Sequence, residues 1–328
     1  MGDPAASDAS ARAWHTKAGR RLAAALTKAR RRPSARTERV LLVVSLVAFV
    51  GAAAVAAGRF PAAPADIRWG LLAIAGLVGM PANVVLNAVE FQVIGRFVDQ
   101  RVAMGRAVKV TIVGSAANLL PLPGSTLVRV QALAAEKARY RDAFVASAAV
   151  GVMAVGANLA LAGVAQAFRA RLPAVVLLLA GAVLVTGAAI AAIVAVFPRS
   201  QAVRPASAAF TVEVIYASVS AVRLWLILHG LGLDVGLPEV FVLTATGALA
   251  TAVGFFPAGL GIREAMIGIL SPVVGIPLAA GLAGAVVERL LWFAVLAIAS
   301  GGLLVRDRHA LSRPRLAGDA SSTDPSGS

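Results

Sequence analysis

The stretch FFPAGLGIREAMIGIL, residues 255–270, decides the fold class because it interrupts a long apolar segment with a helix breaker and two charges. Pro257 is followed by Gly259 and Gly261, and then by the adjacent pair Arg263 and Glu264. A charge at the centre of a lipid-facing helix costs about 2.5–3.5 kcal/mol on insertion scales. Irregular backbone at membrane depth is tolerated only when it is buried in protein or lines a wet cavity. The stretch therefore predicts a broken helix that faces a protected interior.

The composition places the whole chain in the membrane class. Of 328 residues, 59% are hydrophobic and 14% are charged, whereas soluble domains carry about a quarter charged residues. Apolar runs recur between residues 40 and 305, each near the roughly 20 residues needed to cross the hydrocarbon core. We predict an all-α integral membrane protein, a polytopic helical bundle. Its parts are a basic N-terminal tail at 1–39, a transmembrane domain at 40–305 and a C-terminal tail at 306–328.

The positive charge is concentrated outside the apolar runs. The net charge is +15, ten of the 31 lysines and arginines lie in residues 12–39, and four follow the last run. Basic flanks are typical of cytoplasmic segments and of contact with anionic headgroups. We expect both termini to be cytoplasmic, and no nucleic acid partner, because no aromatic-interleaved module accompanies the charge. The excess of Ala, Arg, Gly and Val indicates a bacterial chain, and hence the cytoplasmic (inner) membrane.

Residue types that carry chemistry are few. The chain has no cysteine and three scattered histidines, so we expect no metal site and no cofactor. It lacks the zinc-binding, nucleophile-elbow and phosphate-loop motifs, and we expect it not to be an enzyme. A membrane-embedded acid–base site built from Glu and Arg alone stays open as an alternative.

Apolar runs and their breakers predict the helices. These lie at 40–58, 69–94, 142–166, 174–197, 208–231 and 278–304, with broken segments at 108–135 and 240–272. The prolines at or near boundaries are Pro173, Pro198, Pro205, Pro238 and Pro277. If both broken segments enter and leave on one side, 23 lysines and arginines are cytoplasmic, four are outside and four lie within the membrane. We therefore predict six full spans plus two re-entrant broken-helix hairpins, about eight hydrophobic segments.

The broken segments repeat a short pattern. PGSTLVR at 123–129 and PAGLGIR at 257–263 share a proline, a small residue, a β-branched residue and an arginine, at an offset of 134. The same offset carries 142–166 onto 276–300. We predict an inverted-repeat architecture with halves at about 40–166 and 174–304. Half-helix N-termini at the breaks favour an anion. The predicted hairpin backbone residues are Pro123, Gly124, Pro257, Gly259 and Gly261.

Two predicted spans carry polar stripes at helical spacing. The stripe on the span at 69–94 is Asn83, Asn87 and Glu90. The stripe on the span at 208–231 is Glu213, Tyr216, Ser220 and Arg223. Either these stripes line a hydrophilic groove, or they form interhelical hydrogen bonds that hold the bundle together.

Further charges lie within apolar segments, as a single arginine and two adjacent pairs. Adjacent residues on a helix point about 100° apart, so we expect the members of each pair to find partners elsewhere. Arg129 or Arg263 would then pair with Glu288 or Glu264; a purely structural ion-pair network is the alternative. The candidate substrate-binding residues are Arg129, Arg263, Glu264, Arg223, Glu288, Arg289, Asn83, Asn87, Glu90 and Glu213.

The segments NLLPLPGSTLVRVQAL (118–133) and FFPAGLGIREAMIGIL (255–270) resemble the two signatures of the lysylphosphatidylglycerol synthase transmembrane-region family. ERLLWF at 288–293 resembles the last-span pattern of that family around an arginine, here Arg289. The resemblance implies a membrane domain that, in full-length synthases, translocates aminoacylated phosphatidylglycerol between leaflets. Those synthases add a soluble aminoacyltransferase domain, which we do not expect here. Ser125 and Thr126 stand where the first signature usually has Gly-Asp or Gly-Glu, so the resemblance leaves the substrate open.

Together these features predict a transporter-like protein that flips an anionic or aminoacylated phospholipid, or a lipid-linked substrate, between leaflets. Arginines would hold the anionic headgroup, and carboxylates would hold those arginines or a cationic part of the substrate. Two alternatives stay open: an accessory subunit or membrane enzyme of lipid-linked glycan or lipid modification, and a non-transporting membrane scaffold. The expected partners are membrane lipids, with a second copy of the chain or a lipid-modifying enzyme as further candidates.

Overall fold

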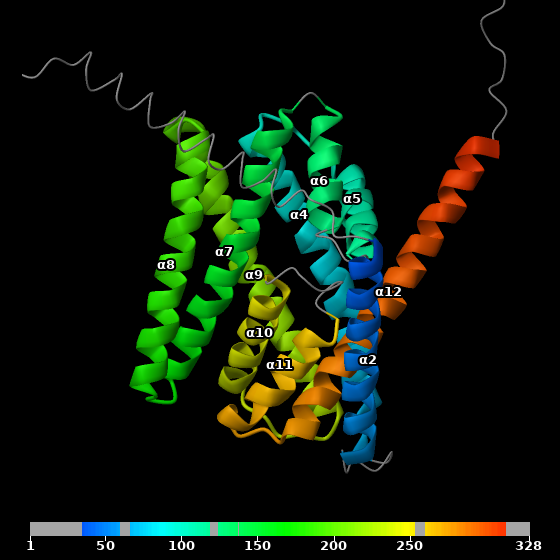
Figure 1. The fold of residues 1–328 in the computed structure, drawn as a ribbon, viewed down its shortest axis with the longest axis vertical. Helices are drawn as coiled ribbons and strands as arrows, with labels where there is room; N and C mark the ends of the chain where they lie inside the picture. Colours follow the sequence, from blue (N-terminus) through cyan, green and yellow to red (C-terminus); the bar gives the residue numbers. More distant parts are fainter. Residues whose placement is uncertain (1–34, 60–65, 119–123, 137, 253–259, 313–328) are drawn as a thin grey trace, which may run out of the picture.

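The computed structural model describes residues 35–59, 66–118, 124–136, 138–252 and 260–312, and the regular secondary structure within these ranges is helical (Figure 1). The elements are α2 (Ala35–Arg59), α3 (Trp69–Ile74), the π-helix η2 (Ala75–Gly79), α4 (Met80–Phe97), α5 (Met104–Ala117), α6 (Gly124–Ala134), α7 (Tyr140–Ala167), α8 (Leu172–Val196), α9 (Arg199–Gly230), α10 (Leu237–Ala252), α11 (Ile262–Leu270), the short 3-10 helix η4 (Ser271–Val274) and α12 (Leu278–Ser312). The predicted all-α fold class is confirmed.

Five helical segments are long and apolar enough to cross a membrane within the described part of the chain. They are Trp69–Phe97, Tyr140–Ala167, Leu172–Val196, Arg199–Gly230 and Leu278–Leu303. The apolar part of α2, Val43–Arg59, is shorter, and it falls in the region predicted as the first of six spans. On α8, the side chains of Val176, Leu177, Val183 and Leu184 are 67–75% exposed, as expected of a surface that faces lipid. The chain is a multi-pass membrane protein.

Two pairs of short helices replace full spans and lie at opposite ends of the molecule. In Figure 1, α5 and α6 pack together in the upper half, and α10 and α11 pack together in the lower half. Each half of the chain has the same element order: two long helices, a short pair and another long helix. This order and the opposite placement of the pairs are what an inverted repeat requires.

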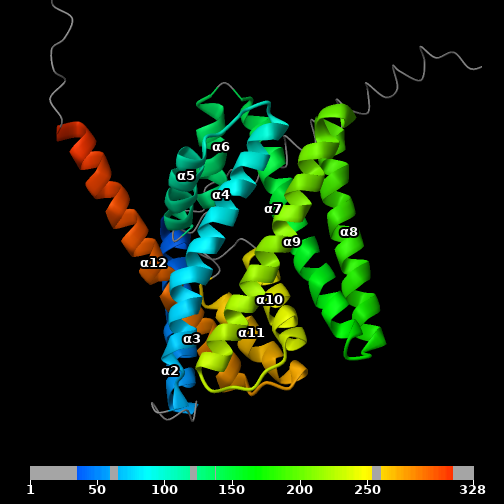
Figure 2. The same ribbon diagram turned by 180° about the vertical axis from the view of Figure 1, so that it is seen from behind.

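Helix α9 begins nine residues before the predicted start at 208. Pro205 was expected near a boundary, but it lies inside α9, which begins at Arg199. That expectation was wrong because a proline in the second turn removes a single backbone hydrogen bond, which a long packed helix tolerates. The extra turns place Arg199 and Arg204 at the upper end of the bundle, where α9 packs against both α4 and α7 (Figure 2).

A π-helical turn interrupts the second long helix just before Pro81. Proline has no N–H and its ring crowds the preceding turn, and a π-turn is one way to accommodate this. Gly79 closes the π-turn, and a Cβ at that position would come 3.1 Å from Cγ of Arg223. The missing side chain of Gly79 thus leaves room for the aliphatic stem of Arg223, whose guanidinium bonds to Glu288 on α12.

The apolar core is divided, and the division positions the site. One cluster joins α4, α6 and α7 to the first half of α9, through Ala202 and Ala209. A second joins α10, α11 and α12 to the last part of α9, through Leu224 and Leu228. The stretch of α9 between the clusters carries Glu213, Tyr216 and Ser220, which line a polar cavity.

Candidate functional site: a charged cavity between the two halves

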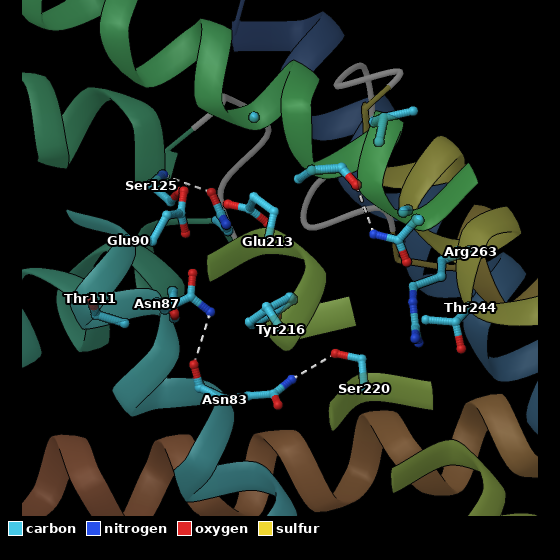
Figure 3. A pocket seen from close by; sticks show the side chains of 18 of the residues that line it. Asn83, Asn87, Glu90, Thr111, Ser125, Glu213, Tyr216, Ser220, Thr244 and Arg263 are labelled. Atoms are coloured by element: carbon cyan, nitrogen blue, oxygen red, sulfur yellow. Dashed lines mark hydrogen bonds between the residues drawn. The ribbon is translucent and has the colours of Figure 1, made fainter. Parts of the chain in front are cut away.

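A cavity of about 730 Å³ lies between the two apolar clusters. Its polar and charged lining comes from α4, α5, α6, α7, α9, α10, α11 and α12, so both halves of the chain contribute. The lining includes Asn83, Asn87, Glu90, Thr111, Ser115, Asn118, Ser125, Thr126, Arg129, Ser147, Asn158, Glu213, Tyr216, Ser220, Arg223, Thr244, Arg263, Glu288 and Arg289 (Figure 3). Asn83 and Glu213 lie near the middle of the spanning segments Trp69–Phe97 and Arg199–Gly230, and Ser125 and Arg263 lie next to the helix breaks. The cavity therefore sits at mid-depth of the spanning segments.

Arg129 of α6 is held by the polar stripe of α4. Its guanidinium donates to both carboxylate oxygens of Glu90, at 2.7 and 3.1 Å, and to Oδ1 of Asn87 at 2.9 Å. Arg129 is 9% exposed and Glu90 is 8% exposed. A two-point ion pair of this kind fixes the position of both side chains, so α6 is anchored to α4 through its only arginine.

The amide stripe continues the same network toward α9. Asn83 Nδ2 donates to Oγ of Ser220 at 2.9 Å, and Asn87 Nδ2 donates to the backbone oxygen of Asn83 at 3.2 Å (Figure 3). The two interpretations of the stripes therefore hold together: Asn83 and Ser220 bond between helices and also line the cavity.

The adjacent charge pairs of α11 and α12 exchange partners. Arg263 donates to Oε2 of Glu288 at 2.6 Å, and Nε of Arg289 donates to Oε1 of Glu264 at 2.8 Å. Arg129 or Arg263 was expected to pair with Glu288 or Glu264. Arg263 does pair with Glu288, but Arg129 pairs with Glu90 and Glu264 pairs with Arg289. Because neighbouring residues point about 100° apart, two helices that cross here each offer one acid and one base. The four charges form two interhelical pairs.

Arg223 of α9 is a third arginine that contacts the acids of α11 and α12, through Glu288. It donates to the second oxygen of Glu288, so one carboxylate holds both Arg223 and Arg263. Nε and Nη1 of Arg223 are buried and have no hydrogen-bond partner among the described residues. A buried donor without an acceptor costs about 1–3 kcal/mol, so this side of the cavity favours an added anion.

Glu264 has a structural position behind the cavity wall. It is fully buried, does not line the cavity, and accepts a hydrogen bond from the backbone N–H of Gly261 at 2.7 Å in addition to its pair with Arg289. Gly261 adopts φ +80, where a Cβ would come 2.5 Å from Cβ of Ala48 on α2. Glycine at 261 therefore permits both the left-handed turn and the close approach of α2.

The half-helix N-termini were expected to offer their N–H groups to an anion, and one N–H group at each break is already bonded to a side chain. The N–H of Gly261 is taken by Glu264, and the N–H of Ser125 donates to Oδ1 of Asn118 at 2.7 Å. Side-chain acceptors close to these breaks satisfy the backbone before a ligand arrives.

Nine of the ten candidate substrate-binding residues line the cavity, and Glu264 is the exception. Gly124 is buried in the contact between α5 and α6, where a Cβ would come 2.2 Å from the backbone oxygen of Ala117. Three predicted hairpin residues, Pro123, Pro257 and Gly259, lie outside the described residues. Sequence reasoning missed Thr111, Ser115 and Asn118, which recur at helical spacing along α5 and its end, and it also missed Asn158 on α7 and Thr244 on α10.

Within the described residues, no three His, Asp or Glu side chains come close enough together to hold a metal ion. The cavity acids are each directed at arginines or stand alone. The chemistry this arrangement offers is therefore the binding of charged groups by guanidinium and carboxylate side chains.

The chain was compared with models of known protein families. The family model described as lysylphosphatidylglycerol synthase TM region matches residues 38–300. The chain belongs to this family. No curated protein matches it. The segments 255–270 and 288–293 lie within the matched range, and they supply Arg263, Glu264, Glu288 and Arg289. Their exchanged ion pairs give these motifs a common physical reason, because neither helix can bury its charges without the other.

Proposed function

We propose that this member of the lysylphosphatidylglycerol synthase TM region moves a lipid with an anionic headgroup between the two leaflets. The charged cavity at mid-depth of the spanning helices carries the proposal. A lipid-facing arginine or carboxylate at that depth is expensive, and four arginines and three glutamates converge on one space. A headgroup that crosses the membrane needs such a polar space part-way.

The phosphate of the headgroup would bind at Arg223 and Arg263. These two guanidinium groups share the single carboxylate of Glu288, so this end of the cavity has one positive charge in excess. The donors of Arg223 that lack an acceptor add to the attraction. Apolar residues from α7, α8 and α12, among them Val152, Val185 and Phe293, line the same cavity. They are suited to the glycerol and upper acyl region of an amphiphile.

Orientation follows from the charge at the two ends of the bundle. At the upper end the described loops and helix ends carry Arg96, Arg101, Arg106, Arg139, Arg141, Arg199 and Arg204. At the lower end they carry Arg59, Arg68, Arg169 and Arg171. The positive-inside rule then assigns the upper end to the cytoplasm of a bacterium. The α5–α6 and α10–α11 pairs become re-entrant hairpins from the cytoplasmic and outer faces, and both termini are cytoplasmic.

The test is transport of a fluorescent phosphatidylglycerol in proteoliposomes that contain the purified chain, followed by quenching with a membrane-impermeant reductant. We expect the wild-type chain to move the lipid and Arg263→Ala to abolish movement, since the variant removes one of two phosphate ligands. Arg204→Ala is the matched control, because Arg204 is exposed at the end of α9, and we expect it to transport normally.

Other outcomes separate the alternatives. A folded wild-type chain that moves no lipid would overturn the proposal and favour a scaffold or an accessory subunit. Co-purification with a lipid-modifying or glycosyl-transferring enzyme would then identify the partner. If the Arg263→Ala variant folds and transports at the wild-type rate, Arg263 does not bind the phosphate.

A further inference from the structure

Glu213 of α9 is a buried carboxylate without a cation of its own. It is 3% exposed and lines the cavity. Among the described residues, none donates a hydrogen bond to it or forms an ion pair with it, whereas the other cavity acids, Glu90 and Glu288, are held by arginines. An isolated ionised carboxylate is costly to bury, so Glu213 needs a positive partner from the cavity or a proton.

The charges around Glu213 do not neutralise it. It lies within electrostatic range of Glu90 on α4 and of Arg129 on α6. Arg129 is already occupied by both oxygens of Glu90. One arginine therefore faces two carboxylates, and this end of the cavity has an excess negative charge when both are ionised.

The opposite end of the cavity has the opposite excess. Titratable residues there are Arg223 on α9 itself, Arg263 on α11, and Glu288 and Arg289 on α12. Tyr216 lies between the two ends, within electrostatic range of Arg129 and of Arg263 (Figure 3). The described lining residues of α5, α7, α8 and α10 are not titratable. The charge of the cavity thus changes along α9, from a negative excess near Glu213 to a positive excess near Arg223.

We propose that Glu213 is a binding site shared by a proton and by the primary ammonium group of a lipid headgroup. This proposal rests on the proposed function and deepens it: the phosphate binds at Arg223 and Arg263, and the amine of the same lipid binds toward Glu213. In the empty cavity the carboxyl carries a proton. When the ammonium group arrives, that proton leaves to the cavity water, so one positive charge replaces another and the buried charge is unchanged.

Exchange of this kind couples the lipid to protons. The loaded cavity carries an ammonium group and the empty cavity carries a proton, so an amine-bearing lipid moves one way while a proton returns the other way. A lipid without an amine has no group to displace the proton. The cavity then discriminates between headgroups through Glu213 alone, while the arginine end accepts the phosphate of either.

Binding of short-chain lipids to the purified full chain tests the site without requiring transport. The probes are dihexanoyl phosphatidylethanolamine, which has a primary amine, and dihexanoyl phosphatidylglycerol, which has none. We expect the wild-type chain to bind the ethanolamine lipid about tenfold more tightly at about pH 7.5, since a charge-assisted contact is added. The preference should shrink at about pH 5.5, where protons compete for the carboxylate.

Glu213→Gln should remove the preference at both pH values and leave affinity for the glycerol lipid unchanged. Asp99→Asn is the matched control: it also deletes one carboxylate, but on an exposed residue with φ 57, where asparagine is tolerated. Calorimetry in two buffers of different ionisation enthalpy counts the protons released. We expect up to about one per ethanolamine lipid bound by the wild-type chain and none by Glu213→Gln.

The outcomes keep the site and the proposed function distinct. Equal affinity for the two lipids, or a preference that survives in Glu213→Gln, overturns the shared site even if the wild-type chain moves phosphatidylglycerol between leaflets. A Glu213-dependent preference with proton release supports the site. If the same preparation then moves neither lipid in proteoliposomes, the transport function fails and the site stands as a binding site.

Discussion

The two short helix pairs hold their arginines in different ways. Arg129 of the α5–α6 pair has a carboxylate to itself, Glu90, and both oxygens of that carboxylate are used. Arg263 of the α10–α11 pair shares Glu288 with Arg223. The repeat therefore conserves the helix order and the position of an arginine, but not the charge balance around it. Because the numbers of acids and arginines differ between the two ends, one end of the cavity is negative and the other is positive.

The largest effect is expected from removing the carboxylate that Arg223 and Arg263 share. Glu288→Gln leaves two buried arginines without a counter-charge, and we expect the free energy of unfolding to fall by about 3–5 kcal/mol. Thermal unfolding of the purified chain measures the change. Glu136→Gln is the control, because the Glu136–Arg106 pair is solvent-accessible and should contribute about 0–1 kcal/mol. Equal destabilisation by both variants would contradict the role given to Glu288.

The Arg129–Glu90 pair should respond to substitution differently from Glu288 and the two arginines that share it. Arg129→Met alone strands Glu90 and should cost about 3–5 kcal/mol, whereas Arg129→Met with Glu90→Leu should recover most of that loss, because a buried pair can be replaced by apolar residues. Arg263→Met with Glu288→Leu should not recover, since Arg223 is then left alone. Chemical denaturation of the single and double variants gives both coupling energies, and similar recovery in the two cycles would remove the distinction.

Two glycines with positive φ in the second half, Gly261 and Gly275, give a smaller effect. Gly261→Ala combines a strained positive φ, at about 1–2 kcal/mol, with overpacking against Ala48, at about 1–3 kcal/mol. Gly275→Ala isolates the first cost, because Gly275 has φ +86 and open space around its Cβ position. We expect Gly261→Ala to lower the free energy of unfolding more than Gly275→Ala does. The reverse order in denaturation would place α2 farther from the turn.

The smallest expected effect concerns the start of α6. Asn118→Ala removes the acceptor for the Ser125 N–H and should cost about 0.5–2 kcal/mol. Ser207→Ala is the control, since that exposed hydroxyl only bonds back to Arg204 within the same helix. Hydrogen exchange at Ser125 should rise in Asn118→Ala and not in Ser207→Ala; an unchanged rate would mean that another group protects this amide.

Much of the fold and most of the candidate site were predictable, for local reasons. Apolar run lengths predicted the long helices, and the motif at 255–270 predicted the second break. The stripe Asn83, Asn87 and Glu90 predicted one face of α4 because helical spacing is a local property. The pairing of Arg129 with Glu90 was not predicted, since a sequence states which charges need partners and not which helices bring them together. Thr244 was missed for the same reason, whereas Thr111 recurs with Ser115 at helical spacing and could have been predicted from it.

Local sequence patterns are therefore enough to predict the class of the protein, its broken segments and the residues that are too costly to leave in lipid. Length, polarity and period act within a few turns of one helix, and they can be read without knowing its neighbours. Only the tertiary structure decided that Glu264 faces Arg289, that Glu288 holds two arginines and that Glu213 stands apart. Those outcomes depend on where separate helices cross, because charges interact through distance in space and not through separation along the chain.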